Sequence, residues 1–431
     1  WIIQPFLIEP YAFGWIAPFA FLGLVGILSI CWAVAFSCAA YLSNGKSRLK
    51  KLLMLWATLS LMEIFRSDLI FNFPWGLISA IWINTSISQA LSLCGPHGLT
   101  SIIILSAFLV SKPIFSSVLG SLLLSTLFFF GTKRLNEPLL PKNHQFYIRV
   151  VQPNIPQAEK WEPALAQEFL QLHLGLSKVE HDDNVDLIVW PETAINFFFE
   201  YDEEVQDTIR LNIDSPLILG LRRFEPKSKS LYNSAYVLDK NGEVEYIYDK
   251  TRLVPFGEYI PFDRFFSQFG IFGLATDGIT GFTPGHKKEV VNILGIPPLA
   301  ISICYETIFS SEINDRSKGA EWLLQITNDA WFGRFNGPPQ HLTLARMRAI
   351  EQGLPLLRSA NTGISGVVDS YGRVIKQLDI GERGYIDINL PSNLATTLYS
   401  RIGGRSMNLY IILVLLLTIV SLLFIKRLKL R

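Results

Sequence analysis

Charged residues are scarce in this sequence: only 17% of its 431 residues are Asp, Glu, Lys or Arg. An ordinary soluble domain carries about 25% charged residues. The 38 basic residues are balanced by 37 acidic ones, which leaves a formal net charge of +1. Because nucleic-acid binding needs a clustered basic excess, the balance argues against a nucleic-acid partner. The low charge indicates a membrane setting.

Cysteine is also scarce, with four residues in the whole chain. Three of them lie in or beside hydrophobic runs: Cys31, Cys38 and Cys94. Cys304 is therefore alone in the polar part of the sequence, where no disulfide partner is evident. A lone cysteine commonly packs as a small hydrophobic side chain. The alternative is a reactive thiol, which the residues around Cys304 favour.

Metal-ligand spacings and phosphate-binding loops are missing as well. The six histidines show no paired spacing, and structural zinc sites need four closely spaced Cys or His ligands. No glycine-rich phosphate loop is present, so nucleotide use is not indicated. We therefore expect no metal and no other cofactor, and a structural or substrate-facing role for His341.

Long hydrophobic runs dominate both ends of the chain. The five runs are residues 15–42, 49–66, 95–111, 114–131 and 409–425. A helix needs about 20 apolar residues to cross a bilayer, so we interpret each run as a membrane span. In the second run, Glu63 and Arg66 are spaced to pair on one helix face.

Basic residues give these spans a direction. They cluster at positions 46, 48, 50 and 51, after the first run, and from 426 onward, after the last. Basic loops face the cytoplasm, so the polar region between the fourth and fifth runs is predicted to lie outside it. Lys133, Arg134 and Lys142 oppose this topology, because they follow the fourth run on the outer side.

Between residues 145 and 401 the composition becomes that of a soluble domain. Eight short apolar runs are predicted strands: 146–151, 185–190, 216–221, 234–238, 243–248, 299–304, 322–326 and 364–368. Helical patterns separate several of them, which is typical of one α/β domain. Asn241-Gly242 predicts a hairpin with a type I′ turn. The chain thus divides into a helical region at 1–144, an α/β domain at 145–401, and a final span with a basic tail at 402–431.

Three chemically capable side chains follow predicted strands of this domain. Glu192 comes after the run that ends at Trp190, Lys250 follows the run 243–248, and Cys304 closes the run 299–304. Strand ends are where side chains reach the ligand crevice of an α/β fold. Taken singly, Glu192 and Lys250 would be interpreted as surface residues.

The segments around these residues resemble a known superfamily. Trp190-Pro191-Glu192, Lys250 with Phe256-Gly257-Glu258, and Cys304-Tyr305-Glu306 resemble the Glu-Lys-Cys blocks of the nitrilases, or carbon–nitrogen hydrolases. The match sharpens to the apolipoprotein N-acyltransferase family at positions 63–66, 73–75, 253–258, 328–333, 340–341 and 345–349. This resemblance covers essentially the whole chain. It implies a nitrilase-like αββα sandwich inserted between transmembrane helices. The family has eight spans, so we expect three more upstream of Trp1.

The resemblance implies a role for each residue of the triad. Cys304 would form a thioester, Glu192 would act as the general base, and Lys250 would hold a positive charge beside the sulfur and the oxyanion. The expected supporting residues are Glu258, which can keep Lys250 charged, Tyr305 and Glu306. The expected substrate-binding residues are Trp161, Asn328, Trp331, Phe269 and Phe272. The last two lie in an uncharged, phenylalanine-rich segment that is either a buried loop or an arm dipping into the bilayer.

The resemblance also implies the substrates. A phospholipid would donate an acyl chain, and the α-amino group of a diacylglyceryl-cysteine apolipoprotein would accept it, in the last step of lipoprotein maturation. The setting would be the bacterial inner membrane, with the catalytic domain on the periplasmic side. Two alternatives stay open: a membrane-tethered amidase or nitrilase that passes its thioester to water, and a non-catalytic receptor or transporter on a retired enzyme fold. The presence of all three triad residue types argues against retirement.

Overall fold

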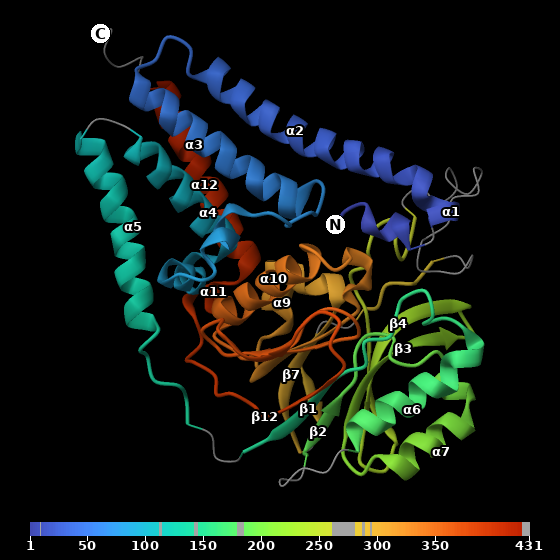
Figure 1. Cartoon of the computed structure of the whole chain (residues 1–431). Coiled ribbons are helices and arrows are strands. Elements are labelled where there is room, and N and C mark those ends of the chain that lie inside the picture. The colour runs from blue at the N-terminus through green and yellow to red at the C-terminus, as the bar shows by residue number, and fades with distance from the viewer. Residues whose placement is uncertain are drawn as a thin grey trace.

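The computed structural model describes residues 1–8, 10–111, 114–141, 145–178, 185–260, 281–286, 289–293 and 295–424, and Figure 1 shows its architecture. A layer of long helices lies over an α/β domain. The chain enters the α/β domain after helix α5 (Ile114–Arg134) and returns to the helices at α12 (Gly404–Phe424). The α/β domain is thus inserted between the apolar helices.

Two six-stranded sheets form this domain. The first has the order β12-β1-β2-β3-β4-β5: β12 (Gly384–Asn389), β1 (Tyr147–Gln152), β2 (Leu187–Val189), β3 (Leu217–Glu225), β4 (Ser230–Leu238) and β5 (Val244–Asp249). The second has the order β11-β10-β9-β8-β7-β6: β11 (Val374–Leu378), β10 (Ser365–Val368), β9 (Leu356–Ala360), β8 (Trp322–Thr327), β7 (Ile296–Ile303) and β6 (Val291–Ile293). Strands β1, β2 and β3 run parallel, as do β7, β8 and β9.

Apolar side chains from both sheets fill the space between them. Val150 and Val189 of the first sheet share one buried cluster with Ile301 and Leu324 of the second. On the outer face of the first sheet pack α6 (Ala166–Ser177) and α7 (Glu203–Asn212). Helices α9 (Ser310–Arg316) and α10 (Gly337–Gln352) pack on the outer face of the second sheet. The layers run helix, sheet, sheet, helix, which confirms the predicted αββα sandwich.

The hydrophobic runs form long helices. They are α2 (Ala17–Leu42), α3 (Arg48–Ile64), α4 (Leu91–Val110), α5 and α12. Within the described residues, four stretches are long and apolar enough to cross a membrane: Pro10–Leu42, Ser86–Val110, Ser116–Arg134 and Gly404–Phe424. Helix α3 is not among them, because it has 17 residues and three of its first four residues are basic. Its membrane crossing stays a prediction.

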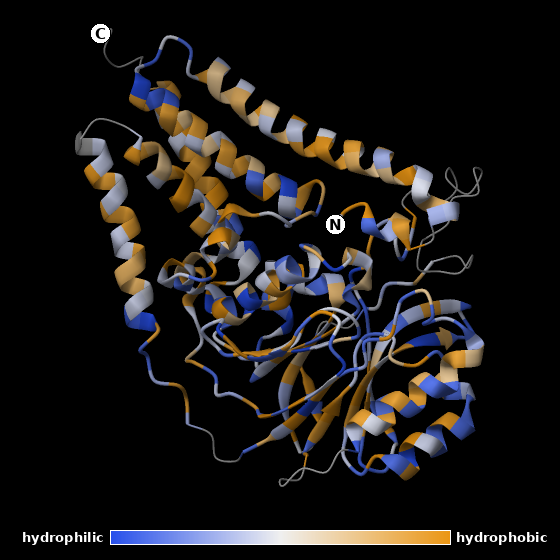
Figure 2. Cartoon of the chain, viewed as in Figure 1, coloured by the Kyte–Doolittle hydropathy of each residue, from blue (hydrophilic) through white to orange (hydrophobic). Residues whose placement is uncertain are grey.

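The connection between α2 and α3 lies at the end of the helical region away from the α/β domain (Figure 1). Figure 2 shows the long helices coloured mainly as hydrophobic, with hydrophilic residues at the end of α3 that lies away from this domain. At that far end the Nζ of Lys46 donates to the backbone carbonyl of Leu422 at 2.7 Å. The basic loop between α2 and α3 and the last turn of α12 therefore lie at the same end of the bundle.

The predicted charge pair is present. Arg66 donates to Glu63 at 2.6 Å, and both side chains are buried. Arg66 also donates to the backbone carbonyls of Phe73 and Trp75, each at 3.0 Å. This pair anchors the segment after α3 to the end of that helix.

The β4–β5 hairpin is present, but its predicted turn type was wrong. Gly242 has a φ of 80°, whereas Asn241 does not adopt a positive φ, as a type I′ turn requires. The carboxylate of Asp239 accepts from the N–H groups of Asn241 and Glu243, both at 2.8 Å. A register shift between Val237 and Leu238 accompanies this turn, so a bulge absorbs the extra residue.

Candidate active site

The three residues expected to form a triad come from turns after three strands, and the backbone is strained at each. Glu192 follows β2, Lys250 follows β5, and Cys304 follows β7. Cys304 has a φ of 51°, Thr193 next to Glu192 has 46°, and Phe256 between Lys250 and Glu258 has 63°. Positive φ costs a non-glycine residue about 1–3 kcal/mol and gathers at functional sites. The structure places this strain around one centre.

The carboxylate of Glu192 is held by three donors. Oε1 accepts from the amide of Asn233 at 2.8 Å and lies 3.4 Å from the ammonium of Lys250. Oε2 accepts from the backbone N–H of Asn328 at 2.8 Å. The residue is 6% exposed. A carboxylate fixed this way is preorganised to take a proton from a neighbouring group.

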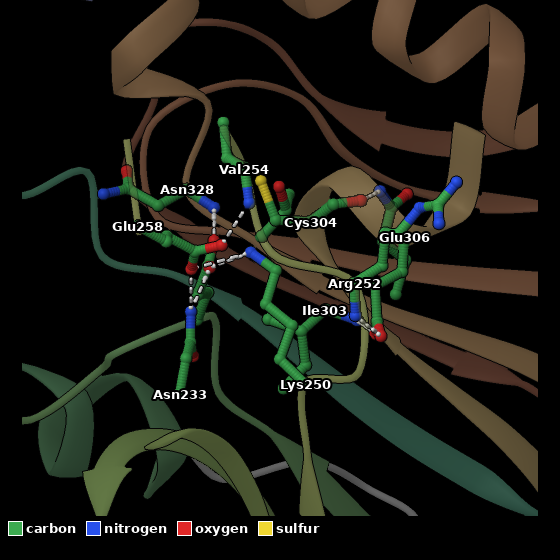
Figure 3. Close-up of polar contacts among 12 residues, drawn as sticks. Asn233, Lys250, Arg252, Val254, Glu258, Ile303, Cys304, Glu306 and Asn328 are labelled. Carbon is green, nitrogen blue, oxygen red and sulfur yellow. Dashed lines mark hydrogen bonds and ion pairs between the residues drawn. The ribbon is translucent and has the colours of Figure 1, made fainter. Parts of the chain in front are cut away.

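Lys250 is shared between two carboxylates. Its Nζ lies 2.9 Å from Glu258 Oε1 and 3.4 Å from Glu192 Oε1. Burial alone would lower the pKa of Lys250, but the charges of Glu258 and Glu192 raise it above its ordinary value. Asn233 bridges the same two carboxylates, donating to Glu258 at 2.9 Å. Lys250 is thus a fixed cation, and Figure 3 shows its side chain directed toward Glu258.

Cys304 is buried next to this cluster. It is 5% exposed and begins the short helix Cys304–Ile308 that follows β7. Burial raises the pKa of the Cys304 thiol, the Glu192 charge raises it further, and Lys250 and a hydrogen bond with Thr327 lower it. The resting sulfur is therefore a thiol, which needs a base to become a nucleophile. The charges of Glu192 and Lys250 both act on this thiol.

A glycine lets the Glu192 turn approach the sheet. A Cβ on Gly220 would lie 2.5 Å from the carbonyl of Pro191 and 2.6 Å from the Cα of Glu192. The backbone of Gly220 instead exchanges hydrogen bonds with this turn, donating to Pro191 and accepting from Ala194. Only glycine permits this close packing.

His341 and its neighbours fix the backbone of Cys304. Nε2 of His341 lies 3.2 Å from the Cys304 carbonyl, which also accepts from Gln325 at 3.0 Å. Nδ1 of His341 lies 2.9 Å from Asp329, which in turn pairs with Arg358. Burial and Arg358 lower the pKa of His341, so the ring is neutral. This residue is structural, one of the two roles considered for it.

Glu306 ties two turns together and is not hydrogen-bonded to the side chains of Glu192, Lys250 or Cys304. Its carboxylate accepts from the N–H of Ile303 at 2.8 Å, from Tyr248 at 2.9 Å and from the N–H of Thr251 at 2.8 Å. Arg316 pairs with it at 3.1 Å, and both side chains are fully buried. Figure 3 shows Glu306 on the opposite side of Lys250 from Glu258. Its supporting role is therefore to join the turn after β5 to the turn of Cys304.

Replacing Glu306 with glutamine should destabilise the protein strongly. Breaking one partner of a buried ion pair costs roughly 3–5 kcal/mol, because the Arg316 charge stays buried without its anion. The measurement is the melting temperature in detergent. Glu243→Gln serves as the control, since Glu243 pairs with Arg210 at 3.1 Å on the surface. Equal melting temperatures for the two variants would contradict this role for Glu306.

The structure describes three of the five expected substrate-binding residues, and also the supporting residue Tyr305. Asn328 is buried beside Glu192 and donates to Gln157 at 2.7 Å. Trp161 is half-buried, with the guanidinium of Arg222 4.2 Å above its ring, and Trp331 is half-buried in the turn after β8. Tyr305 donates to the backbone carbonyl of Asn72 at 3.3 Å. Phe269 and Phe272 lie outside the described residues.

Sequence reasoning missed one residue at the centre of the site. Asn233 lies in the middle of β4, 3% exposed, and bridges Glu192 and Glu258. The feature of the sequence that could have indicated it is a polar amide side chain within a buried strand, where an amide without hydrogen-bond partners would be costly. Within the described residues no group of three or more His, Cys, Asp or Glu side chains could hold a metal ion.

Comparison with known families agrees with this architecture. The family model of the carbon–nitrogen hydrolases matches residues 147–399, and the model of the apolipoprotein N-acyltransferase N-terminal domain matches residues 1–109. The fold and the buried Glu-Lys-Cys cluster define a carbon–nitrogen hydrolase domain carried by membrane helices. The apolipoprotein N-acyltransferase of Rhodopseudomonas palustris is 33% identical over 97% of this chain and 82% of its own length. That of Bradyrhizobium diazoefficiens is 34% identical over 94% and 80%. The chain belongs to the apolipoprotein N-acyltransferase family.

Solved structures of the nitrilase superfamily align with part of this chain. The amidase of Nesterenkonia AN1 aligns with a TM-score of 0.44 and 20% identity, over 59% of this chain and 94% of its own. Nit3 of Saccharomyces cerevisiae aligns with a TM-score of 0.44 and 18% identity, over 57% and 90%.

Proposed function

We propose that this membrane acyltransferase moves an acyl chain from a phospholipid to the α-amino group of a diacylglyceryl-cysteine apolipoprotein through a thioester on Cys304. The observation that carries the proposal is the convergence of a carboxylate, a fixed ammonium and a thiol from the turns after β2, β5 and β7. These are the groups that a cysteine-based acyl transfer needs.

In the first half-reaction the Cys304 thiol gives its proton to Glu192 while the sulfur attacks the ester carbonyl of the phospholipid. The ester C–O bond breaks, and the leaving lysophospholipid takes the proton from Glu192. In the second half-reaction the acceptor amine attacks the thioester and loses a proton to Glu192. The C–S bond breaks, and the proton returns to the sulfur. Lys250 stabilises the oxyanion in both halves, which typically contributes a few kcal/mol.

The product of the second half-reaction tests the proposal. The enzyme in detergent micelles is incubated with a labelled phospholipid and a synthetic diacylglyceryl-cysteine peptide. We expect lysophospholipid and N-acylated peptide in equal amounts, because the amine and not water accepts the acyl group. Free fatty acid with unmodified peptide would favour the tethered hydrolase instead. Activity retained by Cys304→Ala would revive the non-catalytic alternative.

The direction of the membrane helices supports a site outside the cytoplasm. The loop between α2 and α3, which contains Lys46, lies with the first turn of α3, which contains Arg48, Lys50 and Lys51, at the end of the bundle away from the α/β domain. Basic loops stay in the cytoplasm. Arg134, which opposed this topology, is 4% exposed and donates to Gln89 at 2.5 Å and to the carbonyl of Ile350, so it serves a protein contact. We infer a bacterial inner-membrane protein with a periplasmic catalytic domain.

Cysteine accessibility checks this topology. Asn241→Cys in the β4–β5 turn and Asn44→Cys in the α2–α3 loop both create exposed thiols. A maleimide that cannot cross the inner membrane should label Asn241→Cys in intact cells and Asn44→Cys only after lysis, with the parent chain as background. The reverse pattern would place the catalytic domain in the cytoplasm.

A further inference from the structure

A second buried lysine lies beside the Glu192 turn. Lys160 is 3% exposed, in the turn that precedes α6. Its Nζ donates to the backbone carbonyl of Glu192 at 3.0 Å. In the part of the chain that the structure describes, no Asp or Glu side chain pairs with Lys160 within 4.0 Å, whereas Lys250 is paired with two. A buried ammonium that contacts a carbonyl rather than a carboxylate is costly, which indicates a specific use.

The carbonyl that Lys160 contacts begins the strained part of the turn. Thr193, the next residue, has a φ of 46°. The turn also packs against the backbone of Gly220. The turn is therefore held both by the backbone of Gly220 and by the Lys160 ammonium. The Glu192 side chain has its own donors, so Lys160 supplies what they do not, a fixed orientation of the backbone.

We propose that Lys160 is a positioning residue for Glu192, which locks the strained turn through its carbonyl and keeps a positive charge beside the carboxylate that accepts the Cys304 proton. The inference rests on the proposed thioester mechanism, because it assigns Lys160 a part in the proton transfer of that mechanism.

The charges around Lys160 agree with this role. Burial lowers the pKa of Lys160 to about 7, the charges of Glu192 and Cys304 raise it, and that of Arg222 on β3 lowers it. His173 on α6 also interacts with Lys160, and burial lowers the pKa of His173 to about 4. Below neutral pH Lys160 is therefore charged while His173 stays neutral down to about 4.

The test measures acyl-enzyme formation against pH. Wild-type enzyme, Lys160→Met, Lys160→Arg and the control Lys240→Met, which changes an exposed turn residue, are mixed with phospholipid micelles without acceptor. The thioester on Cys304 is followed by intact mass. For Lys160→Met we expect thioester formation to be roughly 10- to 100-fold slower. We also expect the acidic limb of its pH–rate profile, where the rate falls as the pH is lowered, to move up by about one pH unit, as for loss of a close opposite charge. Lys160→Arg should return the acidic limb toward its wild-type position.

Two results would overturn the inference. One is a wild-type rate for Lys160→Met. The other is a slower rate with an unmoved acidic limb, which is what a purely structural role produces. If Lys160→Met does not fold, judged by its melting temperature, Lys160→Gln replaces it under the same criteria. A wild-type enzyme that forms no thioester would instead refute the proposed mechanism, so the two failures are distinguishable.

Discussion

Replacing Cys304 with alanine is expected to reduce acyl transfer by roughly 10⁴- to 10⁶-fold, the size of effect seen when a covalent nucleophile is removed. Cys304 is the only cysteine among the residues expected to do chemistry, and the thiol is buried beside a base and a cation. The loss should fall on the rate and not on folding, because alanine removes one sulfur from a packed site. The measurement is the initial rate of N-acylated peptide formation.

A matched control uses another cysteine of the same chain. Cys38 is exposed on α2, far along the chain from the α/β domain. Cys38→Ala should therefore keep wild-type activity. Equal losses from Cys38→Ala and Cys304→Ala, or a Cys304→Ala enzyme within tenfold of the wild type, would remove Cys304 from the role of nucleophile.

Replacing Glu192 with glutamine should slow acyl transfer by about 10²- to 10⁴-fold, the usual contribution of a general base. The resting Cys304 is a thiol, so its activation depends on a base, and an amide cannot take the proton. In this variant Lys250 still has Glu258 as its ion-pair partner, 2.9 Å away, so the ammonium stays paired and the variant should fold.

Glu258→Gln is the comparison that separates the two carboxylates. Glu258 holds Lys250 and accepts from the N–H of Val254 at 2.9 Å, and it contributes to the site through Lys250. We expect this variant to lose less activity than Glu192→Gln when both initial rates are measured at the same pH. The opposite order would assign the base to Glu258.

The sequence predicts the site better than its surroundings. Cys304 is predictable from its isolation among the cysteines and from the apolar strand before it, whereas Glu192 and Lys250 are predicted mainly from the resemblance of their segments to the nitrilase blocks. Asn233 and Lys160 act by proximity, one from within a strand and the other from a turn, and no local pattern indicates their partners. Their roles depend on which strands become neighbours, which is a property of the folded chain.

Four strands were also missed, for physical reasons. β6, β11 and β12 are edge strands of the two sheets, and edge strands carry polar residues because they are less buried. β9 is central, yet it contains Arg358 and Ser359, which are fully buried and hydrogen-bonded. A buried arginine breaks the apolar run from which a central strand is predicted.

The topology argument shows a similar limit. Counting charges treats Arg134 as a loop residue, whereas the structure places it at the end of α5, bonded to the carbonyl of Ile350 on α10. A basic residue used in a protein contact carries no information about which side of the membrane it faces.

The central claim is that the acyl chain passes through Cys304, and a chase experiment tests it most directly. Enzyme is loaded with phospholipid in the absence of acceptor, separated from free lipid, and examined by intact and peptide mass spectrometry before and after addition of the diacylglyceryl-cysteine peptide. The account predicts one acyl adduct on Cys304 that disappears as N-acylated peptide appears at the same rate. An adduct on another residue, or product formed while the Cys304 adduct persists, would contradict it.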